Sequence, residues 1–351
     1  MIEVRSFTHS DSQAFRQFLH LDERTLIYAS LEYRAFLCSV VPGEPACLLA
    51  IEDDRIVGSL PYFRLDAPGV GAVINSLPWY GSHGGCTLLA QNRCEARQAL
   101  LERFLEIGSE PDVLSATVTL SHVEQAFYDQ YRSILKPQAV DSRIGQVTEL
   151  PPEGDGVESR LDRAVTQKTR NLIRKSLRQG FSSAIVDEEW AWKFLYDTHA
   201  DNMAAMAAKA KPWEHFLALR KTIPEEARAL WIATCDGEPV AGLLLLYFNR
   251  TVEYFTPVVK QEFRPRQPLS FLIYQAMRDA VRKGYRWWNW GGTWASQESL
   301  HHFKAGWGAR DYPYSYLVTT SETGKSVLKA HKDRLPALFP YYYVYPYSQL
   351  E

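Results

Sequence analysis

The stretch WWNWGGTWASQESLHHFKAGWGA, residues 287–309, contains five of the ten tryptophans of the chain and one lysine. At a period of two, Trp288 and Trp290 share one face of a predicted strand and Trp287 and Asn289 share the other, so we expect both faces to be covered. Packing alone accounts for these tryptophans. Gly291 and Gly292 then predict that the strand ends where its backbone passes close to another chain segment or to a ligand.

The second half of the stretch predicts a short helix over residues 298–304 that ends on Phe303 and Lys304. An ammonium held beside an aromatic ring at a strand end is a fixed positive charge. Such a charge can stabilise a developing oxyanion or a phosphate. We therefore take Lys304 as a candidate catalytic residue, and Phe303, Trp290, Gly291 and Gly292 as candidate substrate contacts.

Composition limits the class of protein. The chain has 351 residues, of which 46% are hydrophobic and 23% charged, so we expect a well-packed globular protein of two domains. The N-terminus does not resemble a signal peptide, and no run reaches the roughly 20 apolar residues of a membrane span. The five cysteines form no CxxC pair. We expect a cytoplasmic protein without disulfides, a bound metal or a membrane span.

The sequence predicts two similar halves, residues 1–152 and residues 153–351, joined near a linker rich in proline and glycine at 151–156. Each half begins with a predicted hairpin, turned at residues 53–54 and 236–237, and continues as strand, helix, strand. This order indicates an α+β fold in which each domain has a mixed, mostly antiparallel sheet flanked by helices.

A basic segment opens the second half. No acidic residue occurs between Arg163 and Val186, and the apolar residues from Leu161 to Leu177 recur at helical spacing. We expect one amphipathic basic helix here. It is either a solvated face or a surface that binds the phosphates of a substrate.

The aromatic run at residues 340–347 is not helical in pattern and is expected to pack its rings against a domain surface. Motifs of dinucleotide, P-loop, zincin and α/β-hydrolase sites do not occur in the sequence. His301 and His302 lack an acidic or cysteine partner at metal-ligand spacing, so we expect them to have a packing or surface role.

Three groups of motifs resemble the FemABX-like transferases, a branch of the GNAT superfamily with two tandem GNAT-like domains. The first is GYRWWNWGG followed by LHHFKAGWGA, and the second is KTRNLIRKSLRQG at residues 168–180. The third, DRIVGSLP at 54–61 with NSLPWYGSHGG at 75–85, is similar to relatives that occur with exopolysaccharide systems. The likeness spans nearly the whole chain.

The resemblance implies an N-acyl or aminoacyl transferase that forms an amide on an amino group of a glycan, a cell-wall precursor or a related metabolite. It places the Phe303–Lys304 pair in the catalytic cleft, with the lysine assisting transfer. The donor is either aminoacyl-tRNA or acyl-CoA. An acyl-CoA-dependent GNAT N-acetyltransferase and a non-catalytic GNAT-like binding protein stay open as alternatives.

The region expected to hold the donor's phosphates lacks glycine. Acyl-CoA enzymes of this class use a glycine-rich loop so that backbone N–H groups approach the pyrophosphate. Here two prolines stand at residues 265 and 268 and remove two backbone donors. Arg264, Arg266 and Ser270 with the helix N-terminus are the candidate phosphate contacts. This departure from the CoA pattern is compatible with the donor of the FemABX-like enzymes and leaves both donors open.

Two further residues complete the candidate site. Period-two alternation places Tyr254 on one strand face with Val252 and Thr256, and Glu253 on the opposite face. We take Tyr254 as a candidate for proton transfer. His83, in a glycine-rich loop of the first half, is a candidate contact for the amine acceptor.

Overall fold

The structure is a computed structural model, and the residues it describes are 2–78, 83–89, 94–294 and 296–351. The chain forms two compact units. Unit 1 consists of Met1–Ile144 together with Pro313–Glu351, and unit 2 consists of Gly145–Tyr312. The division differs from the expected one, because residues 313–351 belong to the first unit.

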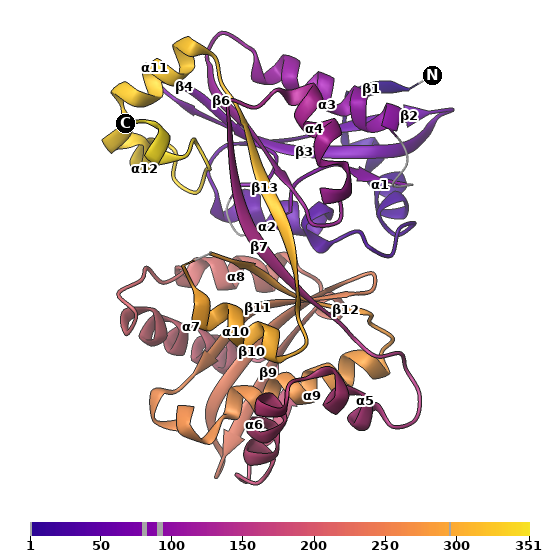
Figure 1. Ribbon diagram of the computed structural model, residues 1–351, viewed down its shortest axis with the longest axis vertical. Helices are drawn as coiled ribbons and strands as arrows, with labels where there is room; N and C mark the ends of the chain where they lie inside the picture. The colour runs from indigo at the N-terminus through magenta and orange to yellow at the C-terminus, as the bar shows by residue number, and fades with distance from the viewer. Residues whose placement is uncertain (1, 79–82, 90–93, 295) are drawn as a thin grey trace. The chain divides into compact units, whose positions relative to one another are not determined.

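Unit 1 is built on six strands in the order β1-β2-β3-β4-β6-β13, with β5 paired to β3. Only β4 and β6 pair in parallel among these strands. The strands are β1 (Glu3–Ser6), β2 (Glu44–Glu52), β3 (Arg55–Ala67), β4 (Gly71–Asn75), β5 (Thr87–Leu88), β6 (Val113–Leu120) and β13 (Arg310–Thr319). The helices are α1 (Ser12–Leu19), α2 (Leu31–Val40), α3 (Cys94–Gly108), α4 (Tyr128–Leu135), α11 (Glu322–Ala330) and α12 (Leu335–Leu338) (Figure 1).

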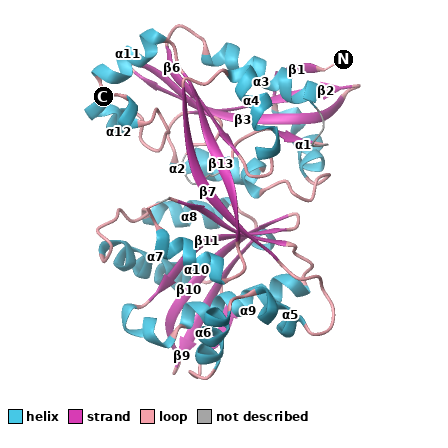
Figure 2. Ribbon diagram, in the orientation of Figure 1, coloured by secondary structure: helices cyan, strands magenta, loops and turns pink. Residues whose placement is uncertain are grey.

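Unit 2 has the strand order β7-β12-β11-β10-β9-β8. The ladders from β8 to β11 are antiparallel, and β11 pairs with β12 in parallel. The strands are β7 (Ala139–Glu149), which enters unit 2 at Gly145, β8 (Ser182–Ile185), β9 (Arg228–Cys235), β10 (Glu238–Phe248), β11 (Thr251–Val259) and β12 (Trp287–Thr293). The helices are α5 (Val157–Ala164), α6 (Gln167–Leu177), α7 (Glu189–Ala204), α8 (Trp213–Thr222), α9 (Pro268–Arg282) and α10 (Glu298–Gly306) (Figure 2). The predicted α+β class is confirmed.

The two halves of the sequence repeat one topology and then exchange a strand. A hairpin, a third strand, a helix and a parallel strand appear as β2-β3-β4-α3-β6 and again as β9-β10-β11-α9-β12. The strand that follows β6 in sequence, β7, is the neighbour of β12, whereas the strand that follows β12, β13, pairs with β6. This exchange carries the C-terminal residues into unit 1 and explains the difference from the expected boundary.

Both predicted hairpin turns form for a local reason. Asp53 and Asp54 have φ angles of 49° and 59°, and Asp236 and Gly237 have 53° and 84°. Two successive positive φ values are the signature of the tight turn whose twist matches antiparallel strands, and Asp and Gly accept that conformation at low cost.

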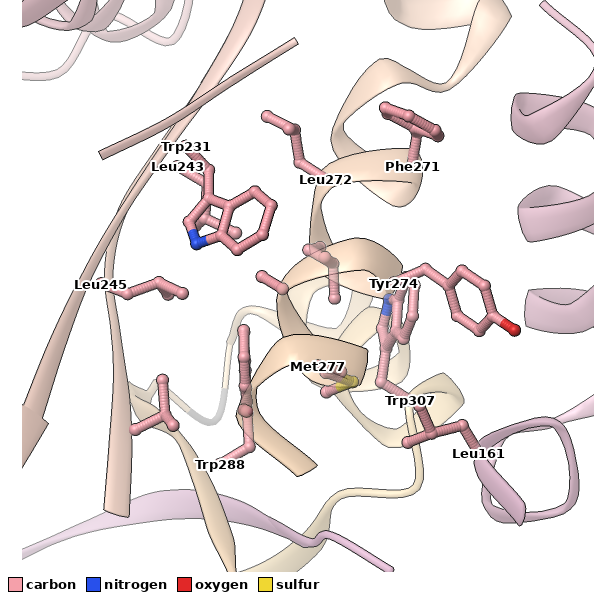
Figure 3. Close-up of a cluster of buried hydrophobic side chains, with 14 of the residues drawn as sticks. Leu161, Trp231, Leu243, Leu245, Phe271, Leu272, Tyr274, Met277, Trp288 and Trp307 are labelled. Carbon is pink, nitrogen blue, oxygen red and sulfur yellow. The ribbon is translucent and has the colours of Figure 1, made fainter. Parts of the chain in front are cut away.

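The core of unit 2 explains the tryptophans of residues 287–309. Trp288 lies in a cluster with Trp231 and Leu245 of the sheet, and α9 covers this face with Leu272 and Met277 (Figure 3). The wider cluster also takes in Trp290 and Trp307. Burying rings of this size supplies the largest hydrophobic contribution per residue.

The prediction of one continuous basic helix is wrong. Instead of one helix, α5 ends at Ala164 and α6 begins at Gln167. Thr166 has extended backbone angles, and its side chain accepts a hydrogen bond from the Thr169 amide. A threonine N-cap therefore starts a new helix inside an apolar pattern that looked continuous.

The C-terminal aromatic run packs on unit 1, as predicted. The Tyr343 amide donates to Asn75 Oδ1 at 2.7 Å, and the Asn75 amide returns a bond to the Tyr343 carbonyl at 2.8 Å. The Tyr343 ring stacks on Tyr316 with centroids 4.5 Å apart.

A buried ion pair supports unit 1. Arg97 Nε donates to Glu124 Oε2 at 2.8 Å, and both side chains are almost fully buried. Tyr131 donates to the same carboxylate oxygen at 3.0 Å and accepts the Cys86 amide at 2.9 Å. The guanidinium also lies 3.7 Å from the centre of the Phe127 ring. The pair therefore fixes the loop that contains Cys86 to the helices behind it.

Replacing Arg97 by Met should destabilise the protein by about 3–5 kcal/mol, because it leaves the Glu124 carboxylate buried without its counter-charge. Arg103→Met is the matched control, since Arg103 and its partner Glu106 are exposed, and should cost less than about 1 kcal/mol. Urea unfolding measures both changes. Equal losses for the two variants would contradict the role of the buried pair.

Candidate active site

The parallel ladder of unit 2 stops early. Strands β11 and β12 pair over three rungs, from Thr251 with Trp287 to Glu253 with Asn289. Both strands continue beyond that point, to Val259 and to Thr293. Backbone groups of β11 and β12 therefore lack their mutual ladder bonds beyond the last rung described.

The corresponding place in unit 1 is closed. Beyond the β4–β6 ladder, the Ser76 amide donates to the Thr117 carbonyl and the Gly84 amide donates to the Thr119 carbonyl, both at 2.8 Å. The chain after β4 thus continues to donate hydrogen bonds to the backbone carbonyls of β6. In unit 2 side chains bond to the strand end instead: the Gly291 amide donates to Asn289 Oδ1 at 3.0 Å, and the carbonyls of Gly291 and Gly292 accept from Lys304. The two units therefore end their parallel ladders differently.

A β-bulge lies next to the end of the ladder. Leu245 pairs with Tyr254, but its neighbour Leu244 pairs with Thr256, so Phe255 is an extra residue in β11. The expected face-sharing of Tyr254 and Thr256 is therefore wrong. The bulge turns Thr256 to the face of Glu253, and bulges of this kind often re-aim side chains at functional sites.

Lys304 is buried at the end of β12, with 3% of its surface exposed. Its Nζ donates to Thr293 Oγ1 at 2.7 Å, to the Gly292 carbonyl at 3.1 Å and to the Gly291 carbonyl at 3.4 Å. Three acceptors match the three protons of an ammonium. The ammonium is thus fixed to the strand end, with its charge directed at the two glycine carbonyls.

The end of β12 is also tied to β7 by buried polar groups. Thr293 donates to Gln146 Oε1 at 3.1 Å, and the Trp290 indole donates to Thr148 Oγ1 at 2.9 Å. Thr148 in turn donates to the Trp307 carbonyl at 3.1 Å. These bonds link Lys304 through Thr293 to the neighbouring strand and position the strand end.

Aromatic rings surround the strand end on one side. The Tyr254 and Trp290 ring centres are 4.8 Å apart, and those of Trp290 and Phe303 are 6.1 Å apart. A Cβ built on Gly291, whose φ is +70°, would meet no atom within 4 Å. Gly291 therefore borders open space, whereas Trp290 is a core residue with its indole already bonded.

Burial shifts the pKa values of both candidate catalytic residues. Removal from water lowers the pKa of Lys304 to about 8, because the charged amine is penalised. It raises the pKa of Tyr254 far above its ordinary value, because the phenolate is penalised. At neutral pH the Tyr254 phenol is a proton donor, and Lys304 is a cation that releases its proton more readily than an exposed lysine.

The structure adds two polar pairs that the sequence analysis did not select. Asn289 Nδ2 donates to Glu253 Oε1 at 3.2 Å on the last rung of the ladder, and both side chains are buried. Lys211 Nζ donates to Thr256 Oγ1 at 3.0 Å beyond the bulge. Burial also lowers the pKa of Lys211 to about 8. Glu253, an acidic residue in an apolar strand, is a sequence signal for the Glu253–Asn289 pair. The bulge that positions Thr256 beside Lys211 has no such signal in the sequence.

The three candidate phosphate contacts lie together at the start of α9. The side chain of Arg266 donates to Gln179 Oε1 at 3.1 Å and to the Gln179 carbonyl at 2.7 Å. Ser270 is buried and donates to Gln267 Oε1 at 3.1 Å. Arg264 is exposed. Only Arg264 of the three has a side chain that faces solvent without a hydrogen bond among the described residues.

His83 belongs to unit 1, where it lines a recess. Its ring packs on Tyr28, His122 and Tyr314 at centroid distances of 5.3, 5.0 and 5.8 Å. The recess also contains Asp22, Arg24, Tyr28 and Glu124. Burial holds the pKa of His83 well below its ordinary value, so the ring is neutral.

Among the described residues, no group of three His, Cys, Asp or Glu side chains is placed to hold a metal ion. His301 does have an acidic neighbour in space, since its Nε2 lies 2.8 Å from Asp311 Oδ2. Asp311 comes ten positions later in the sequence, which is why the spacing analysis missed it. No helix in the described part of the chain is long and apolar enough to cross a membrane.

Residues 164–312 match the family model of the acetyltransferase (GNAT) domain. Unit 2 is a GNAT domain. This match supports an acyltransferase, and the predicted resemblance is confirmed for this domain and for the fold. No curated protein matches the sequence.

Solved structures extend the likeness to both units. The chain is similar to FemX, with a TM-score of 0.71 and 12% identity over 89% of this chain and 96% of FemX. It is similar to the C-terminal domain of a protein from Agrobacterium fabrum assigned as a lysylphosphatidylglycerol synthetase (TM-score 0.58, 11% identity, 93% and 96% covered). A tandem GNAT protein from the clavulanic acid biosynthesis pathway gives a TM-score of 0.53 at 12% identity, with 91% and 98% covered. At these identities the comparison establishes a shared tandem GNAT fold.

Lys304 should make stability depend on pH in a defined direction. Its pKa is about 8 in the folded state against 10.5 ordinarily, so between these values the unfolded state binds more protons. The free energy of unfolding should therefore gain up to about 1.4 kcal/mol per pH unit from this group as pH rises. Urea unfolding from pH 7.5 to 9.5 measures it, with Lys304→Met lacking the gain. Identical pH slopes in the two proteins would contradict the assignment.

Proposed function

We propose that this protein transfers an acyl or aminoacyl group to an amine and forms an amide at the end of the β11–β12 ladder. The acceptor we propose is an amino group of a glycan, a cell-wall precursor or a related metabolite. One observation carries the proposal: the parallel ladder stops after Glu253 and Asn289, beside a bulge and next to the buried Lys304. This arrangement offers backbone groups and a fixed charge to one bound carbonyl.

Amide formation places three demands on such a site. The amine must attack as a neutral group, the tetrahedral oxyanion must be stabilised, and the leaving oxygen or sulfur must receive a proton. An extended donor would lie along β11 as a strand does, between the last rung at Glu253 and Val259, whose amide and carbonyl are bonded to Asn202. That pairing would hold the donor carbonyl beside the end of β12.

Lys304 acts in this proposal through its fixed charge. Its protons are directed at Thr293 and the two glycine carbonyls, so its role is to hold the strand end and to place a positive charge there. In a site that excludes water, such a charge stabilises a developing oxyanion more strongly than it does in bulk solvent. Phe303, Gly291 and Gly292 are the proposed contacts to the bound groups.

Tyr254 supplies the proton to the leaving group. Its ring is held against Trp290, and burial keeps the phenol protonated by raising its pKa. A neutral phenol is the form that can protonate a departing ribose oxygen or a thiolate. Independently of this site, His83 is proposed as a contact for an amine in the recess of unit 1.

Two donors are compatible with the site, and different observations support them. The start of α9 lacks glycine, begins with Pro268 and has the Arg266 side chain engaged by Gln179, which supports an aminoacyl-tRNA. The match of residues 164–312 to an acetyltransferase domain supports an acyl-CoA as the alternative. Arg264 would contact the phosphates of either donor.

A donor panel tests the proposal. The purified protein is incubated with a pool of amino sugars and peptide amines and with either charged tRNA or acetyl-CoA, and amide products are detected by mass spectrometry. We expect an amide product with the wild-type protein and a large loss with Lys304→Met. Absence of product with both donors, or equal product from the variant, would overturn the proposed function.

Tyr254→Phe should lower kcat by about 10²-fold or more and leave KM nearly unchanged, because the ring contacts remain while the proton donor is lost. Tyr285→Phe is the control, since this tyrosine of unit 2 packs on Tyr247 away from the ladder end. Steady-state kinetics with the active donor measure both. Wild-type kcat in Tyr254→Phe would remove the tyrosine from the mechanism.

A further inference from the structure

The outward face of α6 is a ridge of cations that the rest of the described chain leaves without counter-charge. Lys168, Arg174, Lys175 and Arg178 are exposed, and none has a side-chain hydrogen bond or ion pair in the described structure. Elsewhere in unit 2 exposed cations do find carboxylates, as Lys193 does with Asp197 and Arg282 with Glu158. We call these four residues the α6 ridge.

The helix geometry explains why the charges gather. Thr169, Ile173 and Ser176 recur at a spacing of three or four residues and are buried, so the opposite side of α6 faces away from the core. Arg174, Lys175 and Arg178 lie on that side. No acidic residue occurs in the sequence from Arg163 to Val186 to neutralise them. A strong local positive potential follows, although the whole chain has a net charge of −2.

Aliphatic side chains accompany the ridge. Leu177, the last residue of α6, is 46% exposed, and Ile185 of β8 is 48% exposed. Ile185 is paired with Trp231 of the unit 2 core, so it lies on the sheet face that α9 covers, in the strand that directly follows α6. Leu177 lies within one helical turn of Arg174 and Arg178, so the ridge combines unpaired cations with an exposed aliphatic side chain.

We propose that the α6 ridge, with Leu177 and Ile185, docks on an anionic lipid surface. Cations attract the anionic headgroups, and the two aliphatic side chains enter the interfacial region, which is the combination that peripheral membrane sites use. RNA offers the same phosphate charge but gains from stacking rings. The aromatic residue nearest in sequence to the ridge, Phe181, is instead packed against Phe271 and under the Arg266 guanidinium. The observations therefore favour a lipid surface, and this inference does not rest on the proposed transfer activity.

Vesicle binding tests the proposal with the full chain. Sedimentation with vesicles of phosphatidylglycerol and phosphatidylcholine in equal parts should retain the protein at low salt, and pure phosphatidylcholine vesicles should not. Reversing three charges, as Arg174→Glu, Lys175→Glu and Arg178→Glu, should lower the partition coefficient at least about a hundredfold. The control reverses three exposed cations of unit 1, Arg55→Glu, Arg132→Glu and Arg334→Glu, and should bind far better than the ridge variant although its net charge is the same.

A second pair of variants separates lipid from RNA. Leu177→Ser with Ile185→Ser should weaken vesicle binding, whereas Leu21→Ser, at a residue that is 67% exposed in unit 1, should not. Binding of bulk tRNA in a gel-shift assay without vesicle binding would overturn the proposal, as would equal vesicle binding by the two charge-reversal variants. Circular dichroism and the thermal transition show that each variant is folded.

Discussion

The candidate site depends on one exchanged strand. The end of β12 extends past its ladder with β11, so that its remaining partner is β7, the strand that follows the first repeat in sequence. Gln146 and Thr148 of β7 bond to Thr293 and to the Trp290 indole, and both of these bonds are buried. Side chains hold the backbone of the same strand end, through the bond of the Gly291 amide to Asn289 and the bonds of Lys304 to the two glycine carbonyls. The exchanged strand and these side chains together fix the end of β12 after β11 has diverged from it.

The burial of Lys304 has a cost that its hydrogen bonds only partly offset. An ammonium taken out of water loses several kcal/mol of solvation, and three neutral acceptors recover part of that loss. The lowered pKa of Lys304 reflects the part of the lost solvation that its hydrogen bonds do not recover. Leucine or methionine would close the end of β12 without such a penalty. An apolar side chain would not place a positive charge beside the glycine carbonyls, whereas the ammonium of Lys304 does.

The sequence predicted what is decided locally. The tight turn at Asp53 and Asp54, with two positive φ values, depends only on local sequence. The tryptophans before Gly291 likewise form the expected strand. Three features escaped prediction. The exchange of β7 and β13 is a choice of partner, and the bulge at Phe255 appears only against β10, so distant residues decide both. The break between α5 and α6 is local, since Thr166 caps α6, but the continuous apolar spacing concealed it. The first of these moved residues 313–351 into unit 1.

Duplication followed by divergence accounts for the different ends of the two parallel ladders. Both repeats have a parallel strand pair at the same place, but in unit 1 the amides of Ser76 and Gly84 bond to β6, whereas in unit 2 the side chains of Asn289 and Lys304 bond to the backbone of β12. A Cβ on Gly84 would come within 2.6 Å of Leu77, so the close approach in unit 1 requires glycine there. The match to the acetyltransferase domain covers residues 164–312 alone, which fits a chain whose transfer chemistry resides in the second repeat.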